Sequence, residues 1–149
     1  MADFIGPKND FLGLFALTTG HGLEKLVSEF EKQNDDYNVI MAKVIADRLV
    51  EAFAERMHER VRTEFWGYAE NETMKNEDLI KERYQGIRPA PGYPSCPSHV
   101  EKDLIWKLLD VEKNTGITLT ETRAMSPAAS ICGWYFSHPK SRYFFVRES

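Results

Sequence analysis

The sequence predicts an α+β fold, in which a twisted antiparallel sheet is flanked by helices and helical residues outnumber strand residues. Residues 37–65 contain neither proline nor glycine and repeat apolar residues at three- and four-residue steps, which predicts one long helix. Residues 11–19 and 130–137 are short and rich in strand-forming side chains. A proline-rich loop at 85–97 lies between the predicted long helix and the predicted strand at 130–137.

The first elements are a strand at 11–19 and a helix at 23–32, joined by Gly20-His21-Gly22. A strand, a G-x-G and a helix are also the opening of a dinucleotide-binding fingerprint. The third glycine of that fingerprint would stand at position 25, where the chain has Lys25. The glycines therefore predict a tight turn and no dinucleotide site.

The long helix begins after Asp35 and Asp36, either of which can cap it. Its recurring apolar residues predict the buried face: Met41, Ile45, Leu49, Ala52, Phe53, Met57 and Val61. The opposite face carries Asp47, Glu51, Glu55, His58 and Arg62. This polar face is either a solvated surface or an acidic stripe toward a partner or a cationic ligand, and the pattern alone favours the solvated surface.

The second half of the chain predicts shorter elements. A helix is expected at 77–84 and another at 99–113, opened by a capping box of Ser98 and Glu101 and stopped by Gly116. Residues 117–125 alternate as a strand does. Strands at 130–137 and 143–147 predict an antiparallel hairpin whose last strand has an exposed hydrophobic edge.

The proline-rich loop is the strongest local candidate for a binding site. Four of the seven prolines fall between Pro89 and Pro97, so this segment is stiff and cannot be helical. Arg88 offers a fork for a carboxylate, Gly92 lets a backbone approach a ligand, and Tyr93 offers a flat face. Such a loop suits a small anionic or planar ligand. The alternative is a rigid surface crossover with Arg88 in a structural ion pair, which these residues alone favour.

Composition excludes several classes of function. The formal net charge of −4 does not indicate a nucleic-acid surface, and no apolar run is long enough to span a membrane. The N-terminus has no signal-peptide pattern, so we expect one cytoplasmic domain over residues 1–149. The single Cys96–His99 pair does not predict a metal site. Without a P-loop, HExxH or GxSxG motif, we assign no catalytic residue.

Several long segments together resemble the activation domain of cobalamin-dependent methionine synthase. They are residues 12–20, 35–62, 88–102, 119–125 and 133–144. The family's enzyme moves a methyl group from methyltetrahydrofolate to homocysteine through cobalamin. The resemblance implies that this chain binds S-adenosyl-L-methionine and supports reductive methylation of cob(II)alamin. The cobalamin would be held by a partner cobalamin-binding domain, and flavodoxin or a diflavin reductase would supply the electron.

The resemblance also implies roles for individual residues. Arg88 would hold the carboxylate of S-adenosylmethionine, and backbone from Ala90 to Gly92 would line the adenosine. The implied S-adenosylmethionine-binding set is Arg88, Ala90, Gly92, Tyr93, Tyr143, Phe144 and Glu82. Within it, Glu82 would lie near the ammonium or sulfonium. Asp47 and Glu51 would face the docked cobalamin domain.

The family's domain is longer than this chain, so we expect the chain to correspond to its C-terminal half. The preceding half supplies strands and an acidic contact to S-adenosylmethionine, and residues 144–149 depart from the family pattern. Two alternatives therefore stay open beside the reactivation domain. One is a free-standing S-adenosylmethionine-dependent methyltransferase, and the other is a docking scaffold that binds no small ligand. Whether the chain alone is an enzyme is left undecided, although catalysis by it alone is not expected.

Overall fold

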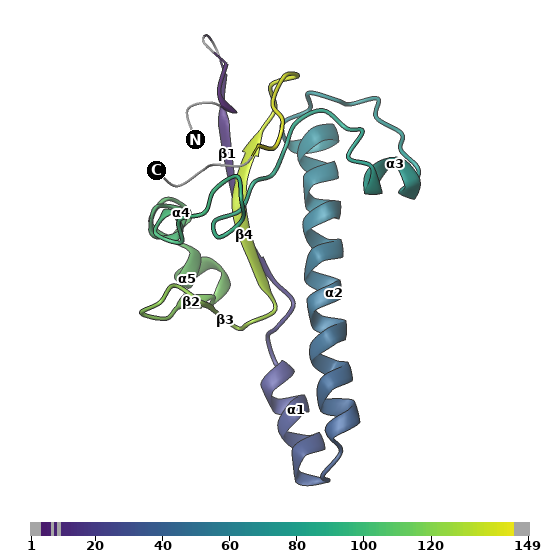
Figure 1. Cartoon of the computed structure of the whole chain (residues 1–149), viewed down its shortest axis with the longest axis vertical. Coiled ribbons are helices and arrows are strands. Elements are labelled where there is room, and N and C mark those ends of the chain that lie inside the picture. The colour runs from purple at the N-terminus through teal and green to yellow at the C-terminus, as the bar shows by residue number, and fades with distance from the viewer. Residues whose placement is uncertain (1–3, 7, 9, 145–149) are drawn as a thin grey trace.

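The computed structural model describes residues 4–6, 8 and 10–144, and it confirms the α+β class. A two-stranded antiparallel sheet runs through the middle of the molecule, with the long helix α2 along one side (Figure 1). Helices α4 and α5 and a small second sheet lie on the other side (Figure 1). The central sheet is thus covered on both faces.

The elements follow one another in this order: β1 (Leu12–Thr18), α1 (Leu23–Lys32), α2 (Asp36–Arg60), a π-helical turn η2 (Val61–Phe65), α3 (Asn76–Ile80), α4 (Glu101–Leu109), α5 (Val111–Thr115), β2 (Thr118–Leu119), β3 (Met125–Ser126) and β4 (Ser130–Phe136). Among the described residues, no helix is long and apolar enough to cross a membrane.

Strands β1 and β4 pair from Leu12 opposite Phe136 to Thr18 opposite Ser130. Because successive side chains alternate between the faces of a sheet, each strand contributes to two cores. On the α2 side, β1 supplies buried Phe15 and Leu17, which pack with Val50, Ala54, Val61 and Tyr135. On the α4 side, the core contains Ile105, Val111, Ile117, Cys132, Trp134 and Phe136.

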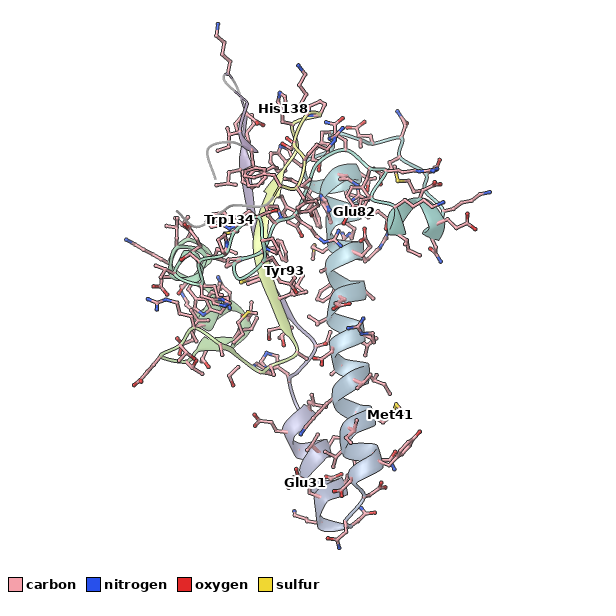
Figure 2. The ribbon with its side chains drawn as sticks, in the orientation of Figure 1. Glu31, Met41, Glu82, Tyr93, Trp134 and His138 are labelled. Atoms are coloured by element: carbon pink, nitrogen blue, oxygen red, sulfur yellow. The ribbon has the colours of Figure 1, made fainter. Side chains whose placement is uncertain are left out.

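Helix α2 begins as predicted, with the side chain of Asp35 accepting a hydrogen bond from the backbone N–H of Asn38 at 3.1 Å. Its predicted orientation is wrong over the middle turns. The buried residues are Ala46, Val50, Ala54 and His58. Ile45, Leu49 and Phe53 remain 50%, 54% and 40% exposed, and Met41 lies on the outer side (Figure 2).

The reason for this orientation lies on the facing sheet and in the partners of the polar residues. Large aromatic side chains, Phe15 and Tyr135, already fill the space on the sheet, so small helix residues pack best against them. Contrary to the solvated-face prediction, His58 and Arg62 are fully buried. Both have polar partners inside the protein, which makes their burial possible.

Three shorter predictions also need correction. The helix expected at 99–113 is divided into α4 and α5 at Asp110, whose φ of +48° interrupts regular helix geometry. Ser98 accepts a hydrogen bond from the N–H of Val100 at 3.3 Å, so it does not form the predicted capping box. Residues 117–125 form the paired strands β2 and β3 around a turn. Gly116 ends α5 in a left-handed conformation, as predicted.

The predicted hairpin of 130–137 with 143–147 is wrong within the described residues, because β4 pairs with β1. Tyr143 and Phe144 lie outside any strand, and residues 145–147 lie outside the described residues. The physical reason is that both edges of β4 are already paired, one with β1 along its full length and the other with Ile87 and Pro89 of the proline-rich loop.

The other edge of β4 is occupied by the start of the proline-rich loop. Ile87 and Phe136 exchange two backbone hydrogen bonds of 2.9 and 3.1 Å, and the N–H of Trp134 donates to the carbonyl of Pro89 at 3.0 Å. Proline has no N–H to donate but can accept this bond. A Cβ on Gly133 would lie 2.6 Å from that carbonyl oxygen, so the close approach requires glycine there. Ile87 is buried in the core on the α4 side, and Arg88 points the opposite way, toward α2.

Candidate functional site

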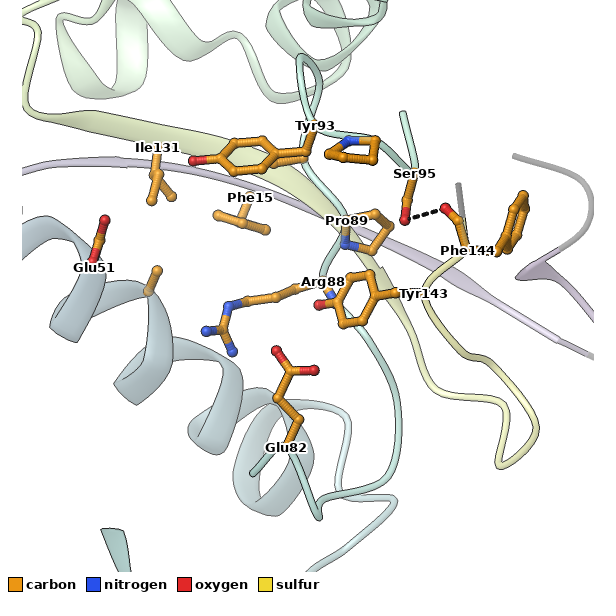
Figure 3. Close-up of a pocket in the computed structure, with 13 residues that line it drawn as sticks. Phe15, Glu51, Glu82, Arg88, Pro89, Tyr93, Ser95, Ile131, Tyr143 and Phe144 are labelled. Carbon is orange, nitrogen blue, oxygen red and sulfur yellow. Dashed lines mark hydrogen bonds between the residues drawn. The ribbon is translucent and has the colours of Figure 1, made fainter. Parts of the chain in front are cut away.

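A cavity of about 440 Å³ lies between α2, the central sheet and the proline-rich loop (Figure 3). This volume is within the range of small-molecule sites. The lining residues come from six separate stretches of chain: Phe15, Glu51, Ala54, Glu82, Arg88, Pro89, Ala90, Tyr93, Pro94, Ser95, Ile131, Tyr143 and Phe144.

Most residues predicted for the site line this one cavity. They are Glu51, Glu82, Arg88, Ala90, Tyr93, Tyr143 and Phe144. In Figure 3 the ring of Tyr93 lies across the cavity from Arg88, and the carboxylate of Glu82 points toward the guanidinium. The loop is stiff, and both the loop and α2 pack against β4, which brings these side chains together.

Gly92 and Asp47 are not among the lining residues. Gly92 has φ +96°, and its N–H donates to the carbonyl of Cys96 at 2.8 Å, so it shapes the turn that carries Tyr93. Asp47 is exposed on α2, one turn before Glu51. The structure therefore separates these two residues from the cavity itself.

Arg88 lies at the junction of the cavity and a buried polar cluster. Its Nη2 donates to Glu55 Oε2 at 2.7 Å. Its Nη1 contacts Tyr84 Oη at 3.0 Å and His58 Nδ1 at 3.2 Å. The side chain of Arg88 is 21% exposed. The two sequence interpretations of Arg88 thus coexist, since it lines the cavity and also forms an internal ion pair.

Burial fixes the ionisation of the partners of Arg88. Burial, and then the positive charges of Arg62 and Arg88, lower the pKa of His58 to about 2. The imidazole is therefore neutral near pH 7, and its Nδ1 can accept a hydrogen bond. Burial raises the pKa of Tyr84 to about 12, so that hydroxyl stays neutral as well.

The loop backbone and the far wall are also fixed by side chains. The backbone N–H of Arg88 donates to the hydroxyl of Tyr143 at 3.0 Å. Ser95 Oγ donates to the carbonyl of Phe144 at 2.8 Å, which ties the last described residue to the loop. Burial raises the pKa of Tyr143, which keeps its hydroxyl protonated.

Sequence reasoning missed several residues of the site. Phe15 and Ile131 come from the paired strands and provide an apolar wall. The apolar run of residues 11–19 predicts a strand that contains Phe15, but it does not identify the cavity. Glu55 and His58 were visible only as charged or polar residues of the helix, because their connection to Arg88 spans about thirty residues of sequence.

The cavity suits a ligand that carries both charge signs and a planar ring. Arg88 offers a cation, Glu51 and Glu82 offer anions, and Tyr93 and Tyr143 offer aromatic faces. Within the described residues, no group of three or more His, Cys, Asp or Glu side chains is arranged to hold a metal ion.

Two comparisons with known proteins indicate the same family. The family model of the vitamin B12 dependent methionine synthase activation domain matches residues 1–148. A crystal structure of the MetH reactivation domain bound to AdoHcy is 60% identical in sequence and superposes with a TM-score of 0.93. The match covers 97% of this chain and 46% of that chain, so this chain spans about half the length of its relative. The chain belongs to the activation-domain family of vitamin B12 dependent methionine synthases.

Proposed function

We propose that this chain binds S-adenosyl-L-methionine in the cavity between α2 and the proline-rich loop and serves in reactivation of a cobalamin-dependent methionine synthase. The observation that carries the proposal is the convergence of Arg88, two carboxylates and two tyrosines on one cavity. The ligand has a carboxylate, an ammonium, a sulfonium and a planar base. The AdoHcy bound to the 60% identical relative is the demethylated form of the same ligand.

Each group of the ligand has a counterpart in the cavity. Arg88 would bind the carboxylate, and Glu82 would lie near the ammonium or sulfonium. The loop backbone at Ala90, with Tyr93, would line the adenosine against the apolar wall of Phe15 and Ile131. Tyr143 and Phe144 would close the remaining side.

The contribution of the chain to reductive methylation of cob(II)alamin is then one of position. Bound cobalamin, held by the partner domain, supplies the cobalt chemistry. This chain would hold the sulfonium methyl in a fixed direction, and the gain would come from proximity and orientation. Exposed Asp47, with Glu51 at the cavity rim, would face the cobalamin-binding domain, and flavodoxin or a diflavin reductase would supply the electron.

Titration calorimetry of the 149-residue chain with S-adenosylmethionine tests the proposal. We expect saturable one-site binding, and we expect Arg88→Ala to weaken it by about 1.5–3 kcal/mol, roughly 10- to 150-fold in Kd. Arg83→Ala is the matched control, because Arg83 is exposed and pairs with Asp78 outside the cavity.

Equal affinity in the wild type and Arg88→Ala would remove Arg88 from the site. No binding by a folded wild-type chain would instead support the docking scaffold, which needs no small ligand. The free-standing methyltransferase is not favoured, since the family that matches nearly the whole chain is an activation domain.

A further inference from the structure

We propose that Glu55 is a positioning residue for Arg88, which it holds at the cavity together with Tyr84 and His58 so that the guanidinium is already oriented when a ligand arrives. This inference rests on the proposed function, because it takes the carboxylate of the ligand to be the group that Arg88 binds. Glu55 itself is not a lining residue of the cavity.

Three side chains engage part of the Arg88 guanidinium. A guanidinium has five N–H donors in a fixed plane. Tyr84 and His58 engage the two donors of Nη1, at 3.0 and 3.2 Å, and Glu55 engages one donor of Nη2 at 2.7 Å. Among the described residues, none accepts a hydrogen bond from Nε. One Nη2 donor and the Nε donor therefore remain for a ligand.

The aromatic partners of Arg88 are themselves held in place by packing. His58 is fully buried, stacks on Tyr135 at 5.1 Å between ring centroids, and meets Tyr84 edge to face at the same distance. The ring of Tyr84 in turn lies against the guanidinium of Arg62, whose Cζ is 4.0 Å from the centroid of the Tyr84 ring. Packed aromatic side chains lose little further freedom on binding. They can therefore hold an arginine in place at low entropic cost to the ligand.

Glu55 lies next to the cavity without lining it. It stands on α2 one turn after Glu51, which lines the cavity, and it is 27% exposed. Its Oε2 faces Arg88, while its Oε1 is buried and has no partner among the described residues. A partly buried acid with only one oxygen paired costs stability. Proteins tolerate such a cost mainly where the residue serves a functional site. The geometry gives that pairing a function in orienting Arg88.

The test compares two ligands that differ only at the amino-acid end. S-adenosylhomocysteine has the carboxylate and the ammonium, and 5′-methylthioadenosine has the same adenosine and a thioether but lacks both charged groups. We expect Glu55→Ala to weaken S-adenosylhomocysteine about tenfold, the loss of a charge-assisted contact, and to leave 5′-methylthioadenosine unchanged. Glu55→Gln should retain most of the affinity, because its amide oxygen can still accept from Nη2.

Two further variants keep the test decisive. Glu59→Ala is the control, since Glu59 lies on the same helix and pairs with Arg56 away from the cavity. If Glu55→Ala does not fold, Tyr84→Phe removes an acceptor of Nη1 while it preserves the ring, and it should weaken only the carboxylate-bearing ligand, by a few fold.

The outcomes separate this inference from the proposed function. Equal weakening of both ligands, or unchanged or tighter binding of S-adenosylhomocysteine in Glu55→Ala, would overturn the positioning role. If the wild type binds both ligands and Arg88→Ala loses only the carboxylate-dependent part, the proposed function stands whatever Glu55 does. If the wild type binds neither ligand, the proposed function itself fails.

Discussion

His58 is a buried imidazole that is held in its neutral form. It is fully buried, and its Nδ1 contacts Arg88. Its pKa is lowered to about 2, by burial first and then by Arg62 and Arg88. In the unfolded chain the pKa returns to its ordinary value near 6.5. Below that pH the unfolded state binds a proton that the folded state refuses, so stability falls as the solution is acidified.

Lowering the pH from 7.5 to 5 should therefore reduce the free energy of unfolding by about 2 kcal/mol through His58 alone. Urea unfolding at both pH values measures this loss. His58→Gln should remove that part of the pH dependence, whereas His99→Gln, at an exposed position, should keep it. An unchanged pH slope in His58→Gln would contradict the assignment.

Arg62 and Glu72 form a buried ion pair. Their side chains are 0% and 6% exposed, and three hydrogen bonds of 2.7–2.9 Å join them. Removing one charge leaves the other buried and uncompensated. Glu72→Gln should therefore lower the free energy of unfolding by about 3–5 kcal/mol in a denaturant titration.

The Arg60–Glu64 pair is the matched control for that experiment. It has a comparable distance of 2.8 Å, but both side chains are exposed by 40% or more. Glu64→Gln should change stability little, because solvent screens exposed ion pairs. Equal effects of Glu72→Gln and Glu64→Gln would show that the Arg62–Glu72 pair is accessible to water in solution.

At the scale of elements, the orientation of α2 decides which residues reach the site. Adjacent residues test it directly: Val50 is 4% exposed and Leu49 is 54% exposed. Val50→Ala should lower the free energy of unfolding by about 2 kcal/mol, and Leu49→Ala should lower it much less, despite removing more atoms. A larger loss of stability in Leu49→Ala than in Val50→Ala, measured by urea titration, would support the helix orientation predicted from the sequence.

The contact of the proline-rich loop with β4 depends on Gly133. A Cβ there would lie 2.6 Å from the carbonyl oxygen of Pro89 and 2.9 Å from the ring of Phe15. Gly133→Ala should cost about 2–3 kcal/mol by overpacking. It should also weaken ligand binding, since Pro89 and Phe15 line the cavity. Gly22→Ala, which meets nothing within 4 Å, is the control, and it should cost about 1 kcal/mol from its positive φ without affecting binding.

Sequence patterns predicted the positions of helices and strands better than the way these elements pack together. Strand β1 falls within the apolar run that predicts it, helix α1 matches the predicted helix at 23–32, and Asp35 caps α2. Periodicity could not orient α2, because the helix carries apolar side chains on more than one face. The face that packs is chosen by the aromatic side chains of the sheet.

The site shows the same division between local and long-range information. The motif around Arg88 marks the loop, and the family resemblance adds Glu82 and Tyr143, which the structure brings to the same cavity. Glu55 and Phe15 could not be predicted, because their place at the site depends on which segments pair with β4 and α2. Local pattern therefore identifies the part of the site that one loop supplies.

At the scale of the whole molecule, the two-sided sheet presents one charged and aromatic cavity at its α2 face (Figure 3). In the proposed function this cavity binds S-adenosylmethionine with its amino-acid end at Arg88. A crystal structure of the chain grown with S-adenosylmethionine is the decisive test of that binding mode. We expect the ligand carboxylate within hydrogen-bond distance of the Arg88 guanidinium and the adenosine beside Tyr93. Ligand density elsewhere, or an empty cavity at saturating ligand, would contradict it.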